Sequence, residues 1–197
     1  MTKGFSLRNA RRDDSAEIAK LFLISSDGLA EYIWGMIAEE GEDILDVGTR
    51  RYAREGVDFS WQNCRIAEVD GEIAGMLLAY SIPDPNLPDA DQSGCIDPVL
   101  KPYSELEIPG SYYISGVAVH ASYRGMGIGK GLVQDAHDRA KQSGIGVVSL
   151  ICFESNRKAM QLYRQLGYQE TDRRMIVPHR SLHYSEGDAL LMAFENQ

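Results

Sequence analysis

A glycine-rich stretch, YRGMGIGKG at residues 123–131, constrains this chain more than any other feature. Four of its nine residues are glycine, and Arg124 and Lys130 flank the glycines on either side. Residues 111–120, which precede it, are rich in β-branched and aromatic residues, and apolar residues at helical spacing follow it. The sequence therefore predicts a strand that is joined to a helix by a glycine-rich turn, in which side chains do not cover the backbone amides.

Such a turn is suited to binding an anion. The first turn of a helix leaves about four amides without partners, and the helix dipole is positive there. Glycines let a bulky group such as a pyrophosphate approach those amides, and Arg124 or Lys130 would add charge. A glycine-rich turn without a ligand is the structural alternative, and the stretch alone leaves it open.

Two common phosphate-binding patterns do not fit these residues. The dinucleotide pattern G-x-G-x-x-G fails because Lys130 or Leu132 occupies the position of its last glycine. The P-loop pattern fails because Gly131, rather than serine or threonine, follows Lys130. The phosphate group, if one binds, therefore belongs to another kind of ligand.

The first half of the chain predicts a strand, several helices and a hairpin. Residues 5–10 alternate as a strand, and Asp13 or Asp14 is suited to capping the helix that follows. Residues 26–56 have a helical pattern that is interrupted twice. Two β-rich runs then flank Asp70-Gly71, which is preferred in a tight hairpin turn.

The second half predicts a buried strand and a capped helix. Residues 147–153 are continuously apolar, which is typical of a strand covered on both faces. Asn156 is suited to capping a helix that ends at Gly167. The predicted apolar stripe of that helix consists of Ala159, Leu162, Tyr163 and Leu166. Further strands are expected around residues 168–177 and 189–194.

Composition favours one soluble globular domain over residues 1–197. The formal charge of −9 argues against a nucleic-acid-binding protein. The three cysteines are far apart, so we expect reduced thiols, no metal site and a cytoplasmic location. No segment has the length of apolar residues that a membrane span needs. Residues 83–110 form an acidic, proline-rich insertion that is either a solvated decoration or a wall of a substrate site.

Two motifs together resemble a known family. A strand, R-x-x-G-x-G (Arg124, Gly127, Gly129) and an amphipathic helix resemble the acyl-CoA-binding core of the GNAT acetyltransferases. NRKAMQLYRQLGY at residues 156–168 is similar to that family's N-x-x-A-x-x-L-Y-x-x-x-G-F, with Tyr168 in place of Phe. The resemblance covers roughly residues 114–168 and carries more weight than either motif alone.

The resemblance implies a mixed α/β fold with a mostly antiparallel sheet of about seven strands flanked by helices. It also implies an N-acetyltransferase that moves an acetyl group from acetyl-CoA to a primary amine of a small molecule or peptide. The donor could also be a longer acyl-CoA. A non-catalytic acyl-CoA-binding sensor or scaffold is the alternative, and another nucleotide-binding α/β protein ranks last. A homodimer is left open.

The resemblance assigns binding roles residue by residue. Asn156 would hydrogen-bond the pantetheine, and Tyr163 would point at the thioester sulfur. The central strand would pair with the pantetheine through its backbone beside a splay or bulge in the sheet, using Val117, Ala118 and Val119. The pyrophosphate would be bound by the amides of Arg124, Gly125, Met126, Gly127, Ile128, Gly129 and Lys130.

A catalytic role for Tyr163 also follows from the chemistry of acetyl transfer. Attack of an amine on a thioester expels a thiolate, which a phenol within reach can protonate. A backbone amide near Val117 could stabilise the oxyanion. From its position alone, Tyr163 is equally compatible with a core aromatic on its helix.

The sequence departs from the family at the catalytic base. Tyr113 and Ser115 stand where many members have Glu or His on the central strand, and both are weak bases at neutral pH. Proton removal could therefore use ordered water, or Glu105 or Glu107, or need no dedicated base.

The acceptor amine is expected to enter beside the first helices and the late strands. Asp27, Tyr32, Trp34 and the acidic insertion would suit a cationic amine, although the two aromatic residues could instead pack in the core. Late loops border the acceptor cleft in this family, so the resemblance singles out His183 among the histidines. We expect structural or exposed roles for the other histidines, His120, His137 and His179.

Overall fold

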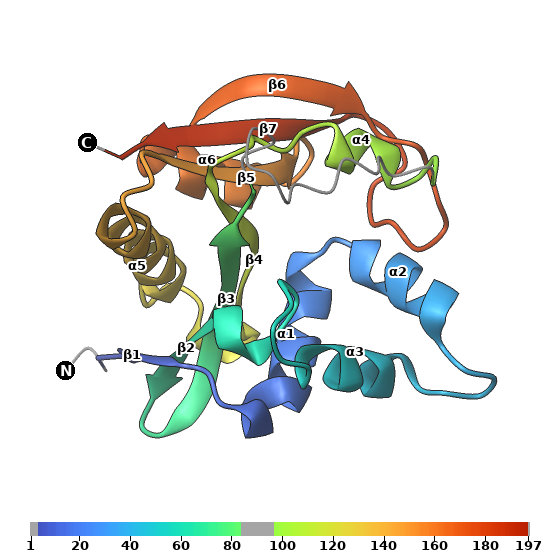
Figure 1. The fold of residues 1–197 in the computed structure, drawn as a ribbon, viewed down its shortest axis with the longest axis horizontal. Helices are drawn as coiled ribbons and strands as arrows, with labels where there is room; N and C mark the ends of the chain where they lie inside the picture. Colours follow the sequence, from blue (N-terminus) through green and yellow to red (C-terminus); the bar gives the residue numbers. More distant parts are fainter. Residues whose placement is uncertain (1–3, 84–96, 197) are drawn as a thin grey trace. The chain divides into compact units, whose positions relative to one another are not determined.

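A seven-stranded sheet organises the chain in the computed structural model, which describes residues 4–83 and 97–196. The strand order is β1-β2-β3-β4-β5-β7-β6 (Figure 1). β4 pairs with β5 in parallel, whereas the pairs β1–β2, β2–β3, β5–β7 and β6–β7 are antiparallel. This confirms the mixed, mostly antiparallel sheet. The strands are β1 (Ser6–Asn9), β2 (Cys64–Val69), β3 (Glu72–Ser81), β4 (Tyr112–Val119), β5 (Val147–Phe153), β6 (Gln169–Met175) and β7 (Asp188–Glu195).

Six α-helices accompany the sheet in the described residues. They are α1 (Ser15–Ser25), α2 (Leu29–Ile37), α3 (Ile44–Tyr52), α4 (Lys101–Ser104), α5 (Ile128–Gln142) and α6 (Arg157–Gln165). Within the described ranges, none of these helices has both the length and the apolar character needed to cross a membrane. The helices predicted after Asp14, in residues 26–56, after the glycine-rich stretch and after Asn156 are all present.

The chain forms two compact units. Unit 1 comprises residues 1–79 and 116–134, and unit 2 comprises residues 80–115 and 135–197. β3, β4 and α5 each begin in one unit and end in the other, so the units are not successive segments of the chain. The single domain over residues 1–197 stays a prediction.

Aromatic side chains from three helices form the core of unit 1. The Phe22 ring stacks on Trp34 with centroids 6.4 Å apart, and it tilts against Tyr52 at 5.5 Å. Trp34 and Tyr52 are fully buried. α3 packs against α1, with Gly48 at the contact, where an added Cβ would lie 2.5 Å from the Trp34 ring and 2.9 Å from Ala19 Cβ. The contact therefore requires a residue without a side chain.

Asp14 lies at the predicted start of α1 but does not cap it. Its carboxylate accepts a hydrogen bond from the Arg11 amide at 2.6 Å and pairs with the Arg8 guanidinium at 2.7 Å. Arg8 also pairs with Glu68 on β2. The guanidinium and the two carboxylates form a half-buried network, which competes with the cap for the Asp14 oxygens. The side-chain cap predicted at this position is wrong for that reason.

The hairpin of β2 and β3 turns as predicted at Asp70-Gly71. Both residues have positive φ angles, 52° and 85°, as a type I′ turn requires. One irregularity follows: Ala67 is opposite Gly75 and Glu68 is opposite Ile73, so Ala74 has no opposite residue. The extra residue is a β-bulge in β3.

Unit 2 is built on β5, which is buried between its neighbours and pairs along its whole length with β7. At the start of β4, the hydroxyls of Ser111 and Ser149 hydrogen-bond at 2.7 Å, and both residues are fully buried. α6 begins at Asn156, whose Oδ1 accepts from the Ala159 amide at 3.2 Å, as predicted. The predicted stripe on α6 is only partly right, since the buried residues are Met160 and Tyr163.

His137, on the part of α5 that belongs to unit 2, packs against two aromatic rings. His137 stacks on Phe194 with centroids 4.0 Å apart, and its Nε2 lies 2.9 Å from the Tyr168 hydroxyl. Burial lowers the pKa of His137 below its ordinary value, and the Asp138 carboxylate partly offsets this. His137 is therefore a structural, neutral histidine, as expected from the sequence.

Replacing Gly48 with alanine should destabilise the protein, because the new methyl group overlaps the Trp34 ring. Overpacking of a core costs about 1–3 kcal/mol, which exceeds the roughly 1 kcal/mol that alanine gains in a helix. Gly35 on α2 is the matched control, since an added Cβ there has no atom within 4 Å. Urea unfolding should show Gly48→Ala losing stability and Gly35→Ala gaining up to about 1 kcal/mol. Equal changes in unfolding free energy for the two variants would contradict the close contact of Gly48 with Trp34.

Unfolding free energy should fall on acidification partly through His137. The unfolded chain protonates this residue near pH 6.5, whereas burial delays protonation in the folded state to a lower pH. Its stabilising contribution is thus complete above about pH 6.5 and is lost as pH falls through the lowered folded-state pKa. The double variant His137→Phe/Tyr168→Phe keeps the rings and should lose less stability between about pH 7.5 and pH 5 than wild type.

Candidate active site

The glycine-rich turn connects β4 to α5 within unit 1. Gly125 and Gly127 both have φ of +80°, in the left-handed region that favours glycine. A Cβ added at either position would meet no atom within 4 Å. The backbone is therefore open on the side where a side chain would stand, and a ligand could approach it there.

Six consecutive amides, at residues 125–130, donate to no backbone carbonyl or side chain in the described chain. The first hydrogen bond at this end of α5 runs from the Gly131 amide to the Gly127 carbonyl at 3.0 Å. A run of unpaired donors at the positive end of a 15-residue helix is a strong anion-binding arrangement.

Basic side chains flank this turn. The Arg124 Nε donates a hydrogen bond to the Val119 carbonyl at 3.2 Å, at the end of β4. The Arg124 side chain is nevertheless exposed. Lys130 is exposed and makes no ion pair with any described residue. His120, just before the turn, pairs instead with Glu17 of α1 at 2.7 Å. Two cations are thus available at the turn.

The central strand is irregular where it approaches the turn. The bulge at Ala74 lies beside the end of β4, since the Ala74 carbonyl accepts from the His120 amide at 2.9 Å. A Cβ added to Gly75 would lie 2.6 Å from the Ala118 carbonyl oxygen. β3 therefore approaches residues 117–119 closely, on the side opposite β5 in the strand order.

β4 pairs with β5 in parallel register near its start, within unit 2. The paired residues are Tyr112↔Val148, Tyr113↔Ser149 and Ile114↔Leu150. The splay or bulge beside residues 117–119 that the family resemblance implies stays a prediction.

Unit 2 contains the two candidate residues of α6. Asn156 caps the helix and is half-buried. Tyr163, two turns along, is 9% exposed, and its ring meets Tyr168 edge-on at 5.7 Å. A buried phenol with a small exposed edge fits either a catalytic acid or a core aromatic, so its role stays a prediction.

Tyr113 lies on β4 beside Tyr80, and the pKa of its phenol is strongly perturbed. Burial raises the pKa of Tyr113 well above its ordinary value, and interactions with Tyr80, Glu107 and Tyr163 raise it further. Tyr80 on β3 meets Tyr113 edge-on, with centroids 5.7 Å apart. The phenol is therefore neutral and cannot itself be the base at ordinary pH. Ser115, on the same strand, is half-buried.

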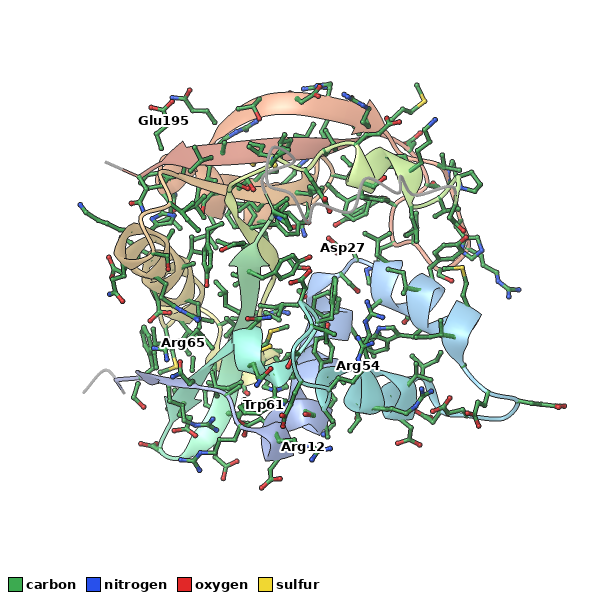
Figure 2. The ribbon with its side chains drawn as sticks, in the orientation of Figure 1. Arg12, Asp27, Arg54, Trp61, Arg65 and Glu195 are labelled. Atoms are coloured by element: carbon green, nitrogen blue, oxygen red, sulfur yellow. The ribbon has the colours of Figure 1, made fainter. Side chains whose placement is uncertain are left out.

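The residues predicted for the acceptor separate between the units. Asp27, with φ of 48°, lies in the turn between α1 and α2 (Figure 2), and Tyr32 is half-buried on α2. Trp34 is 1% exposed and packs in the core of unit 1, which favours the core alternative for it. His183 is exposed in the loop between β6 and β7 of unit 2.

Much of the acidic insertion, including Asp89 and Asp91, lies outside the described residues. Of its carboxylates that are described, Glu105 pairs with Arg174 on β6 at 3.3 Å and with Lys101 at 3.6 Å. Glu107 follows Leu106, which is fully buried. The two neighbouring glutamates thus have different surroundings, and only Glu107 acts on Tyr113.

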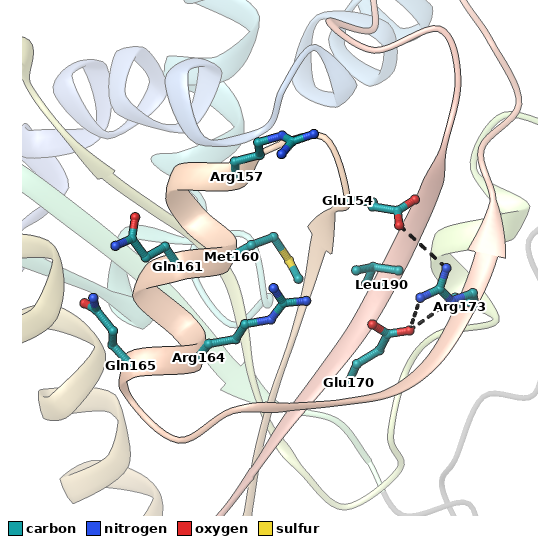
Figure 3. A pocket seen from close by; sticks show the side chains of 9 residues that line it. All are labelled: Glu154, Arg157, Met160, Gln161, Arg164, Gln165, Glu170, Arg173 and Leu190. Atoms are coloured by element: carbon teal, nitrogen blue, oxygen red, sulfur yellow. Dashed lines mark hydrogen bonds and ion pairs between the residues drawn. The ribbon is translucent and has the colours of Figure 1, made fainter.

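A groove of about 640 Å³ lies on α6, β6 and β7 (Figure 3). On one wall, Arg173 pairs with Glu170 and with Glu154, as the dashed lines show. The groove contains none of the residues predicted for the site. Its lining residues are Glu154, Arg157, Met160, Gln161, Arg164, Gln165, Glu170, Arg173 and Leu190.

The described residues contain no group of three or more His, Cys, Asp or Glu side chains suited to a metal ion. Cys64 and Cys152 are buried free thiols in the described part of the chain. One residue was missed from the sequence, Tyr80, which joins Tyr113 across two strands. Its position on the hairpin strand next to the insertion was the one available signal. The contact with Tyr113 depends on strand register, which a single sequence does not determine.

Comparison with known proteins agrees with this geometry. Residues 32–168 match the family model described as the acetyltransferase (GNAT) family. A curated relative, N-alpha-acetyltransferase 30 of Saccharomyces cerevisiae, is 31% identical over 105 residues. That match spans 53% of this chain and 53% of the yeast protein, about half the length of each.

Two solved structures share the fold. A structure described as an acetyltransferase has a TM-score of 0.66 at 20% identity and covers 98% of this chain and 100% of its own. The NatC complex bound to Gag peptide and CoA has a TM-score of 0.59 at 20% identity, with 98% and 99% coverage. The family model spans well over half of the 197 residues, and the chain therefore belongs to the GNAT acetyltransferase family.

Proposed function

We propose that the protein transfers an acetyl group from acetyl-CoA to a primary amine. The run of six amides without acceptors at residues 125–130 is the observation that carries this proposal. Such donors need an anion of several oxygens, and the two phosphates of the CoA pyrophosphate supply them. The positive φ angles of Gly125 and Gly127 keep the approach to these donors open.

The end of β4 and the start of α6 would hold the rest of the cosubstrate. Residues 117–119 lead from β4 toward the glycine-rich turn, and we assign their backbone to the extended, amide-containing pantetheine arm, as the family resemblance implies. Asn156, which caps α6, would hydrogen-bond the same arm. These residues would hold the cosubstrate, which supplies the thioester.

Tyr163 is the proposed acid of the reaction. The amine nitrogen forms a bond to the thioester carbon, and the carbon–sulfur bond breaks with its electron pair on sulfur. The Tyr163 phenol gives its proton to that sulfur, and the nitrogen of the new amide returns one.

A peptide α-amine is the first acceptor to test, because the yeast relative is an N-alpha-acetyltransferase and one fold neighbour is described with a bound peptide. A panel should compare peptides with free and blocked N-termini, a polyamine and an amino sugar, each with acetyl-CoA and a free-thiol readout. Thiol release with no amine would contradict the proposal, and CoA binding without transfer would favour the sensor or scaffold. A homodimer and a cytoplasmic location stay predictions from the sequence.

Gly127→Val should abolish CoA binding while the fold survives. Its side chain would stand where the amides face a ligand, whereas no protein atom lies within 4 Å of the added Cβ. Gly144→Val is the matched control, since Gly144 also has positive φ, 71°, and open surroundings but no role at the turn. Both variants should share the strain of about 1–2 kcal/mol, and only Gly127→Val should lose binding in calorimetry.

Arg124→Ala should weaken CoA binding only modestly, on the order of a few-fold, if the amides supply most of the binding energy. Severe loss in both Arg124→Ala and Gly127→Val would show that the side-chain charge dominates. Loss in Gly144→Val as well would mean that strain, and not the ligand position, explains the result.

Tyr163→Phe should lower kcat by roughly 10- to 100-fold and leave acetyl-CoA affinity within about threefold. The phenol acts only in the transition state, while the ring that packs on Tyr168 is kept. Saturating amine and acetyl-CoA are required, and the melting temperature should be compared with that of Tyr184→Phe, which removes the hydroxyl of a half-buried tyrosine in unit 2. An unchanged kcat in a folded variant would show that Tyr163 is not the acid and is only a core aromatic residue.

A further inference from the structure

An ion pair joins α1 to the segment that leads into the glycine-rich turn. His120, directly after β4, places its Nε2 2.7 Å from the Oε1 of Glu17. The other oxygen of the same carboxylate accepts from Lys20 at 2.9 Å. The side chains of His120 and Glu17 are 26% and 27% exposed, so solvent screens their bond only in part. All three residues belong to unit 1.

The bond has a defined donor. Burial acts to raise the pKa of Glu17, but the hydrogen bonds from Lys20 and His120 lower it further, so the carboxylate is ionised at neutral pH. An ionised carboxylate only accepts hydrogen bonds. The His120 Nε2 therefore carries a hydrogen in the paired state, and another side chain that donates from the same place could replace it.

His120 is also fixed through its backbone. Its amide donates to the Ala74 carbonyl, at the bulge in β3, at 2.9 Å. Its carbonyl accepts from the Tyr123 amide at 2.9 Å, which closes the 3-10 turn over Ala121–Tyr123. One short, hydrogen-bonded turn thus separates His120 from the amides of residues 125–130, and a displacement of His120 is passed on to them.

α1 lies along the end of β4. A Cβ added to Gly116 would stand 2.7 Å from the Ser25 Oγ, so the last turn of α1 contacts β4 there. From Glu17 to Ser25, α1 rises about 12 Å. From Gly116 to His120, the extended chain covers about 13 Å. The two lengths match, so the helix is held against the strand by Ser25 at one end and by the Glu17–His120 pair at the other.

The glycine-rich turn needs an anchor of this kind. Its amides at residues 125–130 donate to no acceptor in the described chain, so hydrogen bonds do not fix its shape. Gly125 and Gly127 add backbone freedom, because glycine has more accessible conformations than any other residue. The shape of the turn therefore depends on what holds its two ends, α5 on one side and His120 on the other.

We propose that Glu17 and His120 position the glycine-rich turn for the CoA pyrophosphate, by the hydrogen bond between their side chains. This inference rests on the proposed function and assigns two positioning residues to that same site. A turn that is already held in its binding shape loses less conformational entropy when the anion binds, and the affinity is higher for that reason.

The pair acts through its hydrogen bond and not through the charge of Glu17. A negative charge on this side of the turn does not itself favour an anion. Removing the charge while keeping the hydrogen bond should therefore preserve CoA affinity, whereas removing the bond should reduce it. This contrast separates a positioning role from an electrostatic one.

Alanine and glutamine variants at the two positions test the proposal. Glu17→Ala and His120→Ala should each raise the Kd of CoA by about 5- to 20-fold in calorimetry, while kcat at saturating acetyl-CoA stays within about twofold. Glu17→Gln keeps an acceptor and His120→Gln keeps a donor, so both should bind CoA within about threefold of wild type. The double alanine variant should bind like either single variant, because the two residues share one bond.

Lys20→Ala is the matched control, since it removes the other partner of the same carboxylate on the exposed side of α1. Its Kd for CoA should stay within about twofold of wild type. An equal loss of affinity in Lys20→Ala would show that the stability of α1 explains the effect. Glutamine variants as weak as the alanine variants would also overturn the inference. If one alanine variant fails to fold, the other and its glutamine counterpart carry the same test.

The outcome also distinguishes this inference from the function on which it rests. A wild-type protein that binds CoA and transfers acetyl groups, with alanine variants that bind CoA equally well, leaves the proposed function standing and removes the positioning role. A wild-type protein that binds no CoA overturns both.

Discussion

Six consecutive backbone amides without acceptors, at residues 125–130, are the constraint on which the rest of the proposed site depends. Polar groups removed from water cost free energy unless they are paired, so this turn must remain accessible or receive an anion. The left-handed Gly125 and Gly127 make the run possible, and α5 adds its dipole to it. The bulge at Ala74 in β3 lies beside the end of β4, where the chain enters this turn.

The two units carry different chemistry. Unit 1 supplies the backbone donors of the glycine-rich turn and the cations of Arg124 and Lys130. Unit 2 supplies the phenols of Tyr80, Tyr113 and Tyr163 and the carboxylate of Glu107. Anion binding needs fixed dipoles, whereas proton transfer needs groups whose pKa depends on their surroundings.

Local patterns made most of the fold predictable. β5 has the bounds of the apolar run, Asp70-Gly71 forms the turn, and Asn156 caps α6, because each depends on residues close in sequence. Predictions were weaker wherever distant residues decide the outcome. Arg8 and Arg11 take the Asp14 oxygens from the cap, and Trp34 packs against Phe22 and Tyr52. The ion pair of Glu105 with Arg174 is another contact between residues far apart in the sequence that local patterns could not predict.

The buried hydroxyls of Ser111 and Ser149 have a consequence for the history of this family. Each satisfies the other at 2.7 Å, so losing either one alone strands a polar atom in the core, while losing both leaves an apolar contact. An ancestral line can therefore exchange the pair only through a less stable intermediate or by two changes together. The two positions should covary, and their joint identity would mark branches of the family tree more sharply than either position alone.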